Sequence, residues 1–552
     1  MLTELEVLVV DCQASGATPV HGALLELGWA VAGPAAATSI EACWVTPPEG
    51  TRVSRPVREL TGWTESCLAT ALPPQQAWSR LSSAAAATGR SPAPCVIHFA
   101  RFEHGFLEDL HRRFGEGSFP LDTICLHEVA RRLFPELPRR NLRALAGYLG
   151  HSPQLVRRSA GHVDASAFIW KALLPALAAA GVQTWDDLKL WLTAKAPTRA
   201  RRTYPLPAEQ RRALPDRPGV YRMLRSNGDV LYVGKAASLK KRIASHFTRG
   251  ARPTERALEM LTQVHTVDVT PAATVLEAAL LETDEIKRLD PPYNVQLRND
   301  DRRVWFASAD LTGATAEPDD DHRLGPLPSR WALTSMAALR ALANGGDLAD
   351  ERLRAAAVGV PPHFAPDEAL FVHAWADFRA RHIDDGGKNV WHALLRASRR
   401  LALTGVAEGT DDSPPEGWDL DRVRRHLDRG LLRGGQLVRR ARWLVLLSDA
   451  TIAFRERGQE SFRLLTFDRG QIVQQLDLGD VTAASAFATM VPGRGGSSPW
   501  RVRQAAINAA AYDRLRVLAT ELARVRAEGG SLFIRIGDRL IGDRGAARLI
   551  AA

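Results

Sequence analysis

Apolar positions near the N-terminus follow the pattern of buried β-strands. Residues 6–11 form an apolar run that ends in a carboxylate, Asp11, and residues 24–31 form a second run that reads as the next strand. Short apolar runs of this length are typical of strands inside an α/β sheet. Residues 165–180 are rich in Ala and Leu and predict a helix. We therefore expect an α/β domain over residues 1–182.

A second pattern, in the middle of the chain, predicts a hairpin followed by helices. Residues 219–221 and 231–235 are short apolar stretches separated by a turn, and each carries a tyrosine. Residues 275–282 have helical spacing of their apolar positions, and this helical run ends at 290–294, where two prolines interrupt it. These elements predict a small α/β domain over residues 213–306.

The remaining sequence predicts linkers, helices and a mixed C-terminal region. Residues 183–212 are basic and residues 307–328 are acidic, and both stretches read as linkers. Residues 329–404 have a helical pattern, and a spacer rich in Glu, Asp, Ser and Pro follows. We expect an α+β accessory domain over residues 419–552, with strands at 443–449, 452–454, 462–467 and 472–476, a helix at 502–528 and a hairpin at 532–541. The predicted fold class is multidomain α/β with a mixed α+β C-terminal region.

The distribution of charge says more about the partners of the protein than its overall composition does. The 552 residues are 45% hydrophobic and 24% charged, which is ordinary for a globular protein. The net charge of +10 favours polyanionic partners. Between residues 200 and 250, twelve Lys and Arg face only three Asp and Glu. The predicted hairpin therefore lies in the region best suited to a phosphate backbone.

The positions of the cysteines and the hydropathy of the chain predict the cellular compartment of the protein. The five cysteines all lie in the first 125 residues, and their spacing does not suit zinc, so we expect reduced thiols in a cytosolic protein. The sequence contains no apolar run long enough to span a membrane and no signal-peptide pattern at its N-terminus. We expect a cytoplasmic protein that does not bind a membrane.

The predicted hairpin carries residues suited to phosphodiester hydrolysis. That reaction needs a base for the water, positive charge beside the phosphate and commonly a divalent metal ion. Tyr221 and Tyr232 are candidate bases, but a tyrosine hydroxyl titrates at about pH 10, so one of them needs help from Lys235, a metal ion or metal-bound water. The sequence does not choose between the two tyrosines. Arg242, on the following helix, has a planar fork that suits phosphate oxygens.

These residues and their order resemble the GIY-YIG nucleases, most closely the N-terminal domain of the excision-repair endonuclease UvrC and its shorter relative Cho. The resemblance implies a catalytic site made of Tyr221, Tyr232, Lys235, Arg242, Glu282 and Asn294. Glu282 would bind the single metal ion, with Glu277 as the alternative carboxylate, and Asn294 would organise the site. A carboxylate with few acidic neighbours suits Mg²⁺ or Mn²⁺. The expected DNA-binding residues are Lys240, Lys241, Arg242 and His246.

The first domain resembles the DEDDh 3′–5′ exonucleases, the RNase H-like proofreading fold of DNA polymerase III epsilon. Those enzymes hold two metal ions with four carboxylates and use a histidine as the general base. Asp11 and Asp164 match two of the carboxylates, and both are expected metal ligands. Gln13 stands where the family has a carboxylate, and Glu103 stands where it has an aspartate.

The general base of this exonuclease-like site is also altered. Ser159 stands at the position of the base, and His162 lies nearby in the sequence. Loss of a ligand charge together with the base weakens metal binding and slows proton transfer. The resemblance therefore implies a retained fold with impaired or absent exonuclease activity.

Together these features predict a metal-dependent endonuclease of bacterial DNA repair that makes one incision, in the manner of nucleotide excision repair. Two alternatives stay open. One is a 3′–5′ exonuclease that uses Asp11, Glu103 and Asp164, and the other is a noncatalytic nucleic-acid-binding protein. The expected partner is double-stranded or structured DNA, and the sequence leaves open whether a UvrB-type partner loads the protein.

Overall fold

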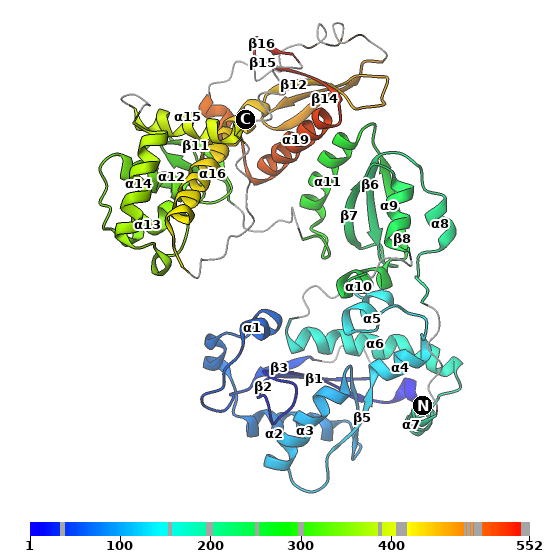
Figure 1. Ribbon diagram of the computed structural model, residues 1–552. Coiled ribbons are helices and arrows are strands. Elements are labelled where there is room, and N and C mark those ends of the chain that lie inside the picture. Colours follow the sequence, from blue (N-terminus) through cyan, green and yellow to red (C-terminus); the bar gives the residue numbers. More distant parts are fainter. Residues whose placement is uncertain are drawn as a thin grey trace. The chain divides into compact units, whose positions relative to one another are not determined.

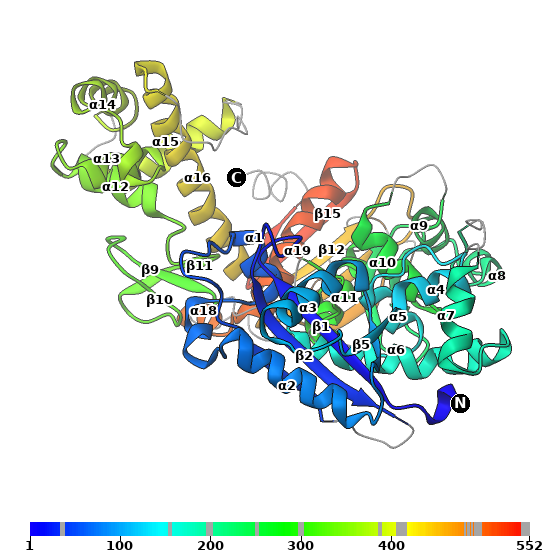
Figure 2. The same ribbon diagram turned by 90° about the horizontal axis from the view of Figure 1, so that it is seen from below.

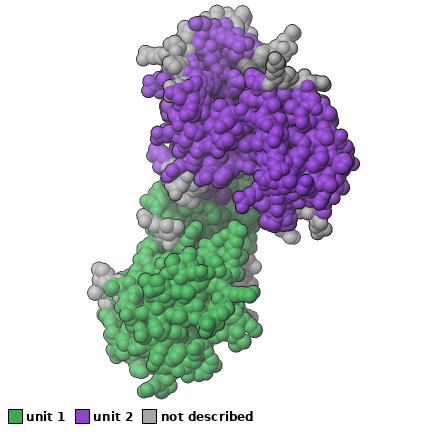
Figure 3. All heavy atoms as spheres, turned by 90° about the vertical axis from the view of Figure 1, so that its left-hand side faces the viewer, with its two compact units in different colours: residues 1–271, 291–293 green, residues 272–290, 294–552 purple. Residues whose placement is uncertain are grey.

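The computed structural model describes residues 1–33, 39–152, 157–194, 202–248, 253–295, 303–384, 389–404, 417–479, 482, 486, 490 and 500–542. The chain divides into two compact units, which Figure 3 colours separately. The first unit comprises residues 1–271 and 291–293, and the second comprises residues 272–290 and 294–552. The expected spacer at 405–416 lies outside the described residues.

The first unit begins with a mixed sheet of strand order β3-β2-β1-β4-β5. Its strands are β1 (Val7–Ala14), β2 (Leu24–Ala32), β3 (Glu41–Trp44), β4 (Ala93–Ile97) and β5 (Leu121–Cys125). β2 is antiparallel to β1 and β3, whereas β4 is parallel to β1 and β5. Both faces of β1 are buried because its side chains alternate between two cores: Val7 and Val9 face one, and Leu8 and Val10 face the other.

Helices cover both faces of this sheet. One core includes residues of α6 (Ser159–Ala179), and the other includes residues of α2 (Pro74–Ala87) and α3 (Ala100–Phe114) (Figure 1). The remaining helical segments of this domain are η1 (Leu2–Glu4), α1 (Arg55–Thr61), η2 (Glu65–Thr70), α4 (Leu126–Leu133), α5 (Leu142–Tyr148) and α7 (Trp185–Thr193). Trp185 and Leu188 of α7 lie in the same core as α6. The first domain therefore extends beyond residue 182, into the stretch that the sequence suggested as linker.

The first unit continues with a small antiparallel sheet of order β7-β6-β8. Its strands are β6 (Gly219–Leu224), β7 (Val230–Ala236) and β8 (Thr266–Pro271), and its helices are α8 (Ala208–Arg212), α9 (Leu239–His246) and α10 (Glu255–Gln263). Ser238 caps α9 by accepting a hydrogen bond from Lys241 N, and Thr254 caps α10 in the same way from Ala257 N. These caps fix where each helix leaves the sheet.

The two domains of the first unit pack against each other through α5 and α10. Asn141 Nδ2 donates a hydrogen bond to Glu259 Oε2 at 2.7 Å. A side chain at Gly147 would collide with Gln263, because a Cβ built there lies 1.9 Å from Gln263 Oε1. The absence of a side chain at Gly147 thus permits the close approach of the two helices.

In the second unit, α11 (Val275–Leu289) packs beside α19 (Ala509–Ala527) (Figure 1, Figure 2). The associated sheet has the order β14-β13-β12-β15-β16. Its strands are β12 (Ala450–Arg455), β13 (Arg463–Asp468), β14 (Gln471–Asp477), β15 (Ser531–Ile536) and β16 (Arg539–Ile541). Leu276 and Leu280 of α11 belong to the core of this sheet.

The rest of the second unit contains a smaller sheet and a group of helices. β9 (Trp305–Ser308), β10 (Ala314–Thr315) and β11 (His322–Leu327) form a sheet of order β10-β9-β11. The helical segments are α12 (Thr334–Ala343), α13 (Glu351–Val358), η3 (Pro362–Phe364), α14 (Glu368–His382), α15 (Val390–Leu403), α16 (Leu420–Leu447) and α18 (Trp500–Ala505). No helix of the described residues is both long enough and apolar enough to cross a membrane.

Two further stretches differ from the sequence-based expectation. Residues 307–328, expected to be an acidic linker, instead contain β10 and β11, whose short strands are stabilised by pairing with β9. Residues 443–449, expected to be a strand, form the last turn of α16 and the start of the following connection. Their apolar residues Trp443, Leu444 and Leu447 pack into the C-terminal core, and such a run does not distinguish a buried helix end from a buried strand.

Candidate active sites

The glycines of the β6–β7 hairpin allow its two tyrosines to approach the backbone. In the strand register Tyr221 lies opposite Gly234, and Tyr232 lies opposite Met223. A Cβ built on Gly234 would lie 2.6 Å from Tyr221 Cζ and 2.8 Å from Tyr232 Cε1, which is closer than real Cβ atoms approach. A Cβ on Gly219 would lie 2.5 Å from Thr270 O of β8. The packing of the two rings therefore requires the glycine of Tyr-x-Gly, Gly234, whereas the close approach of β8 requires the glycine of Gly-x-Tyr, Gly219.

A histidine completes this tyrosine cluster. His246, at the end of α9, has its Nε2 atom 2.9 Å from the Tyr221 hydroxyl oxygen. The ring centroids of Tyr221 and Tyr232 are 6.0 Å apart, and those of Tyr232 and His246 are 6.4 Å apart. The Tyr221 side chain is fully buried and Tyr232 is half-buried. The three rings therefore form one cluster, which we call the tyrosine cluster.

The electrostatics of the tyrosine cluster favour a neutral imidazole. Burial, with a smaller contribution from the positive charge of Arg242, lowers the pKa of His246 to about 4. His246 is therefore uncharged at neutral pH, and its Nε2 can accept the hydrogen bond of the Tyr221 hydroxyl. Sequence reasoning placed His246 among DNA-binding residues and missed this role. Its position four residues after Arg242 on one helix face was the available signal.

The basic residues beside the tyrosine cluster differ in exposure. Arg242, Lys240 and Lys241 lie on α9 with exposed side chains, whereas Lys235, near the end of β7, is half-buried and stands opposite Val220 in the register. Lys241 Nζ lies 3.6 Å from Asp216 Oδ2. An exposed pair at this distance contributes little to stability. The helix thus presents cations to solvent beside the tyrosines.

The two remaining residues of the predicted GIY-YIG set, Glu282 and Asn294, belong to the second unit. Glu282 is half-buried on α11, and Asn294 is buried after the two prolines that follow that helix. The structure thus assigns four residues of the set to the first unit and these two to the second.

Glu277, the alternative metal ligand, has a structural role. Its Oε2 accepts a hydrogen bond from the Thr274 hydroxyl at 3.0 Å, and its Oε1 accepts one from Arg463 at 2.5 Å. Five positions along a helix correspond to about 140° of rotation, so Glu277 and Glu282 project from different sides of α11. Glu277 is thus held by a helix cap and an ion pair.

A separate cavity of about 350 Å³ lies in the N-terminal domain. Asp11 and Gln13 reach it from β1, Glu103 from α3 and His162 from α6. Asp11 and Gln13 are two residues apart on one strand, so they project from the same face. The structure therefore brings together four of the residues that the exonuclease resemblance indicates, and we call this cavity the N-terminal pocket.

Only some of the side-chain oxygen atoms in the N-terminal pocket form hydrogen bonds. Asp11 Oδ1 lies 2.9 Å from His162 Nδ1, and Glu103 Oε2 accepts a hydrogen bond from Cys12 N at 2.9 Å. Asp11 Oδ2 and Gln13 Oε1 are buried without a hydrogen-bond partner among the described residues. Burial, and then the charge of Asp11, raise the pKa of Glu103 well above its usual range. Two close carboxylates and an unpartnered amide oxygen are a donor set that fits a hard cation.

The two other residues of the exonuclease-like set do not line the N-terminal pocket. Ser159 is fully buried at the start of α6, where a Cβ built on Gly28 of β2 would lie 2.8 Å from its Cβ. Asp164 Oδ2 lies 3.1 Å from His151 Nε2, and the Asp164 side chain is 55% exposed. Among the described residues, no group of three or more His, Cys, Asp or Glu side chains is arranged to hold a metal ion. The pocket thus lacks the four-carboxylate set of an intact two-metal site.

Comparisons with known proteins assign the middle of the chain to a family. Residues 217–295 match the UvrC-like GIY-YIG domain. The UvrABC system protein C of Alkalilimnicola ehrlichii is 54% identical over 95 residues, which are 17% of this chain and 15% of that protein. A Mycobacterium tuberculosis protein described as a bifunctional exonuclease/endonuclease is 31% identical over 256 residues, which are 45% of this chain and 39% of that protein. The chain spans between 13% and 39% of the length of the curated relatives compared.

Solved structures were compared as well. The GIY-YIG N-terminal endonuclease domain of UvrC from Thermotoga maritima, bound to magnesium, is 29% identical and covers 16% of this chain and 93% of that chain, with a TM-score of 0.15. Exonuclease I of E. coli is 12% identical and covers 40% of this chain and 48% of that chain, with a TM-score of 0.29. The family match, and not these solved structures, identifies a UvrC-like GIY-YIG domain at residues 217–295 of this multidomain α/β chain. Its N-terminal region resembles the DEDDh exonucleases.

Proposed function

We propose that this protein is a metal-dependent DNA endonuclease of bacterial DNA repair, in which the GIY-YIG domain makes the incision. The tyrosine cluster is the observation that carries the proposal. Its two rings and the glycine that makes room for them, Gly234, lie on one small sheet, and the neutral His246 comes from α9, which also carries exposed cations. The match of residues 217–295 to the UvrC-like domain supports the same reaction.

Each residue of the tyrosine cluster has a definite part in this proposal. His246, neutral at pH 7, accepts the hydrogen bond of the Tyr221 hydroxyl and so increases the negative character of that oxygen. Tyr221 is fully buried and Tyr232 is more exposed, so Tyr232 is the better placed of the two to meet the attacking water. Arg242 stabilises the charge that develops on the phosphate oxygens.

A divalent cation is part of the proposal, and Glu282 is the residue that would hold it. A half-buried carboxylate with hard oxygen donors fits Mg²⁺ or Mn²⁺, which keep several waters when one or two carboxylates bind them. When bound, the cation would neutralise the scissile phosphate and stabilise the leaving oxygen. DNA is the proposed substrate, and the names of the UvrABC relatives suggest a UvrB-type partner.

The test is nicking of covalently closed circular DNA by the purified protein with Mg²⁺ or Mn²⁺. Arg242→Gln should slow nicking by about 100-fold, in line with the loss of one transition-state donor. Lys240→Gln is the comparison: it removes an exposed cation of the same helix that is expected to bind DNA, so it should weaken DNA binding but slow the nicking of bound DNA much less than Arg242→Gln does. Tyr232→Phe should abolish nicking more completely than Tyr221→Phe. Equal rates in wild type and Arg242→Gln would contradict the proposal.

A 3′–5′ exonuclease is the second candidate function, and the unpartnered oxygens of the N-terminal pocket favour it. Its activity would depend on Asp11 and Glu103. Because Asp164 does not line this pocket and Ser159 is packed against β2, we propose that the pocket binds a strand end with little or no hydrolysis. Shortening of 3′-labelled linear DNA, lost in Asp11→Asn, would instead show an active exonuclease.

A further inference from the structure

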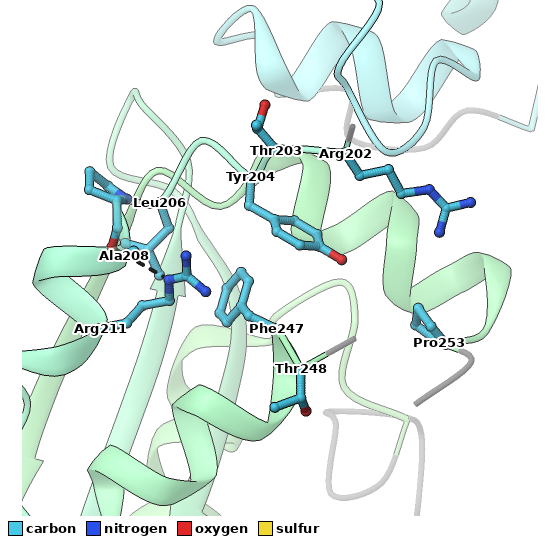
Figure 4. Close-up of a pocket in the computed structure, with 10 residues that line it drawn as sticks. Arg202, Thr203, Tyr204, Leu206, Ala208, Arg211, Phe247, Thr248 and Pro253 are labelled. Carbon is cyan, nitrogen blue, oxygen red and sulfur yellow. Dashed lines mark hydrogen bonds between the residues drawn. The ribbon is translucent and has the colours of Figure 1, made fainter. Parts of the chain in front are cut away.

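A cavity of about 810 Å³ opens in the first unit beside the segment that leads into β6 (Figure 4). It is larger than the N-terminal pocket and lies within the range of roughly 300–1,000 Å³ typical of small-molecule sites. The side chains used below are those of Arg202, Tyr204, Leu206, Arg211, Phe247 and Thr248. They come from the approach to α8, from α8 itself and from the residues that follow α9. We call this cavity the aromatic pocket.

Two aromatic rings form a wall of the aromatic pocket. The rings of Tyr204 and Phe247 meet edge to face, with centroids 5.0 Å apart and an interplanar angle of 84°. The Arg211 guanidinium carbon lies 4.5 Å from the Phe247 centroid. Figure 4 shows Arg211 beside Phe247, and Arg202 on the other side of the Tyr204 ring. Phe247 is buried whereas Tyr204 is only partly buried, so the Tyr204 ring is the one available to a ligand.

The charged side chains among the described residues that line the aromatic pocket are all positive. Arg202 and Arg211 line it, and no Asp or Glu is among the described residues that do so. Thr248 and Tyr204 add hydroxyl groups. Guanidinium groups bind phosphate oxygens, and an aromatic face stacks on any nucleobase. A ligand with a planar ring and a phosphate satisfies both features, whereas a purely apolar ligand would leave the positive charge of the two arginines without a counter-charge among the described lining residues.

The aromatic pocket adjoins the tyrosine cluster. Phe247 directly follows His246, the residue whose Nε2 lies 2.9 Å from the Tyr221 hydroxyl. Leu206, Phe247 and Tyr221 belong to one hydrophobic core. A nucleotide in the aromatic pocket would therefore be held by the same small core that positions the proposed catalytic tyrosine.

We propose that the aromatic pocket binds one unpaired nucleotide of a DNA strand, with its base against Tyr204 and its phosphates at Arg202 and Arg211. A base inside a duplex is stacked on both sides and does not enter a concave pocket unless it leaves the stack. The pocket therefore selects single-stranded or distorted DNA. This inference rests on the proposed function for the identity of its substrate, and it adds the kind of strand that the protein prefers.

The test measures binding without cleavage. Fluorescence anisotropy of a dye-labelled short single strand, and of the same strand in a duplex, is recorded in EDTA, so that the result does not depend on nuclease activity. Tyr204→Ala should weaken single-strand binding by about 5- to 100-fold, as expected for the loss of one stacked base. Duplex binding should change less than twofold. Tyr204→Phe keeps the ring and should bind the single strand as wild type does.

A matched pair of arginines tests the phosphate contact. Arg211→Gln should weaken single-strand binding. It should also reduce the slope of log K against log [salt] by nearly one, the change expected for the loss of one phosphate contact. Arg212→Gln removes a neighbouring exposed arginine of α8 that does not line the pocket, so its effect should be small. Arg202→Gln, at an exposed position, repeats the test without risk to folding, and thermal unfolding of every variant verifies the fold.

Two results would overturn the inference. One is single-strand binding by Tyr204→Ala equal to that of the wild type. The other is an equal loss for single strand and duplex in that variant, which would indicate a general electrostatic surface. Loss of single-strand binding in Tyr204→Ala by a protein that fails to nick closed circular DNA would support the aromatic pocket and reject only the proposed nuclease activity.

Discussion

The tyrosine cluster and the N-terminal pocket each bring together only part of a predicted nuclease set. The cluster is assembled by local packing around one hairpin, whereas the pocket joins residues of three elements and leaves one predicted carboxylate outside it. In the tyrosine cluster, Gly234 leaves room for the two rings, and α9 brings His246 to Tyr221. In the N-terminal pocket, β1 still places Asp11 and Gln13 side by side, yet Asp164 lies elsewhere and is paired with His151. A retained fold therefore does not by itself retain a site.

Of the substitutions that test this comparison, Gly234→Ala should have the largest effect on the nicking rate. The added Cβ would lie 2.6 Å from the Tyr221 ring, so the hairpin must shift or the rings must separate. We expect loss of nicking by at least about 100-fold, because misplaced reacting groups forfeit most of the benefit of positioning. Nicking rates on closed circular DNA measure the effect. Ser226→Ala is a control at an exposed position of the hairpin turn. Nicking by Gly234→Ala at the wild-type rate would show that the cluster is not the active site.

Glu277→Ala should destabilise the protein by about 1–3 kcal/mol, because it removes the buried partner of Arg463 and leaves only the exposed Asp477 beside that guanidinium. Chemical denaturation of the second unit measures this change. Glu277→Gln keeps a hydrogen-bond acceptor for Thr274 and should lose less stability. Both variants should keep their response to divalent metal in the nicking assay, and a lost response would make Glu277 the metal ligand in place of Glu282.

His246 should make stability depend on pH. Its pKa in the folded protein is lowered to about 4, below the usual value of about 6.5. The unfolded chain therefore binds more protons between these values. The contribution is fully present above pH 6.5 and is lost as the pH falls toward 4, by up to about 3 kcal/mol. Denaturation at several pH values, compared with His246→Asn, should show a flatter profile in the variant, and identical profiles would refute the assignment.

Ser159→His tests why the N-terminal pocket lacks the expected base. The larger side chain has no space against Gly28 of β2, so we expect a loss of about 1–3 kcal/mol in stability from overpacking. The same substitution should not produce exonuclease activity, even combined with Gln13→Glu. Thermal unfolding and shortening of a 3′-labelled strand provide the two readouts. Rapid shortening by the double variant would show that only those two positions had silenced the site.

Local patterns were enough to predict the hairpin of the tyrosine cluster. Its strands are short, its turn is tight and Gly234 stands where the rings need space, so each part is specified by neighbouring residues. The pairing of His246 with Tyr221 was not predicted because it depends on how α9 packs on the sheet. The direction of Asp164 depends likewise on the packing of α6. The β9–β11 sheet was missed because its strands are short and carry acidic connections, and only pairing defines them.

The most direct test of the central claim compares Glu282→Gln with Asp11→Asn in one reaction. Closed circular DNA and 3′-labelled linear DNA are incubated with each purified variant and Mg²⁺. We predict that nicking of the circle disappears in Glu282→Gln and persists in Asp11→Asn. Nicking that survives in Glu282→Gln, or laddering from the 3′ end that is lost only in Asp11→Asn, would contradict the account and make the N-terminal domain the enzyme.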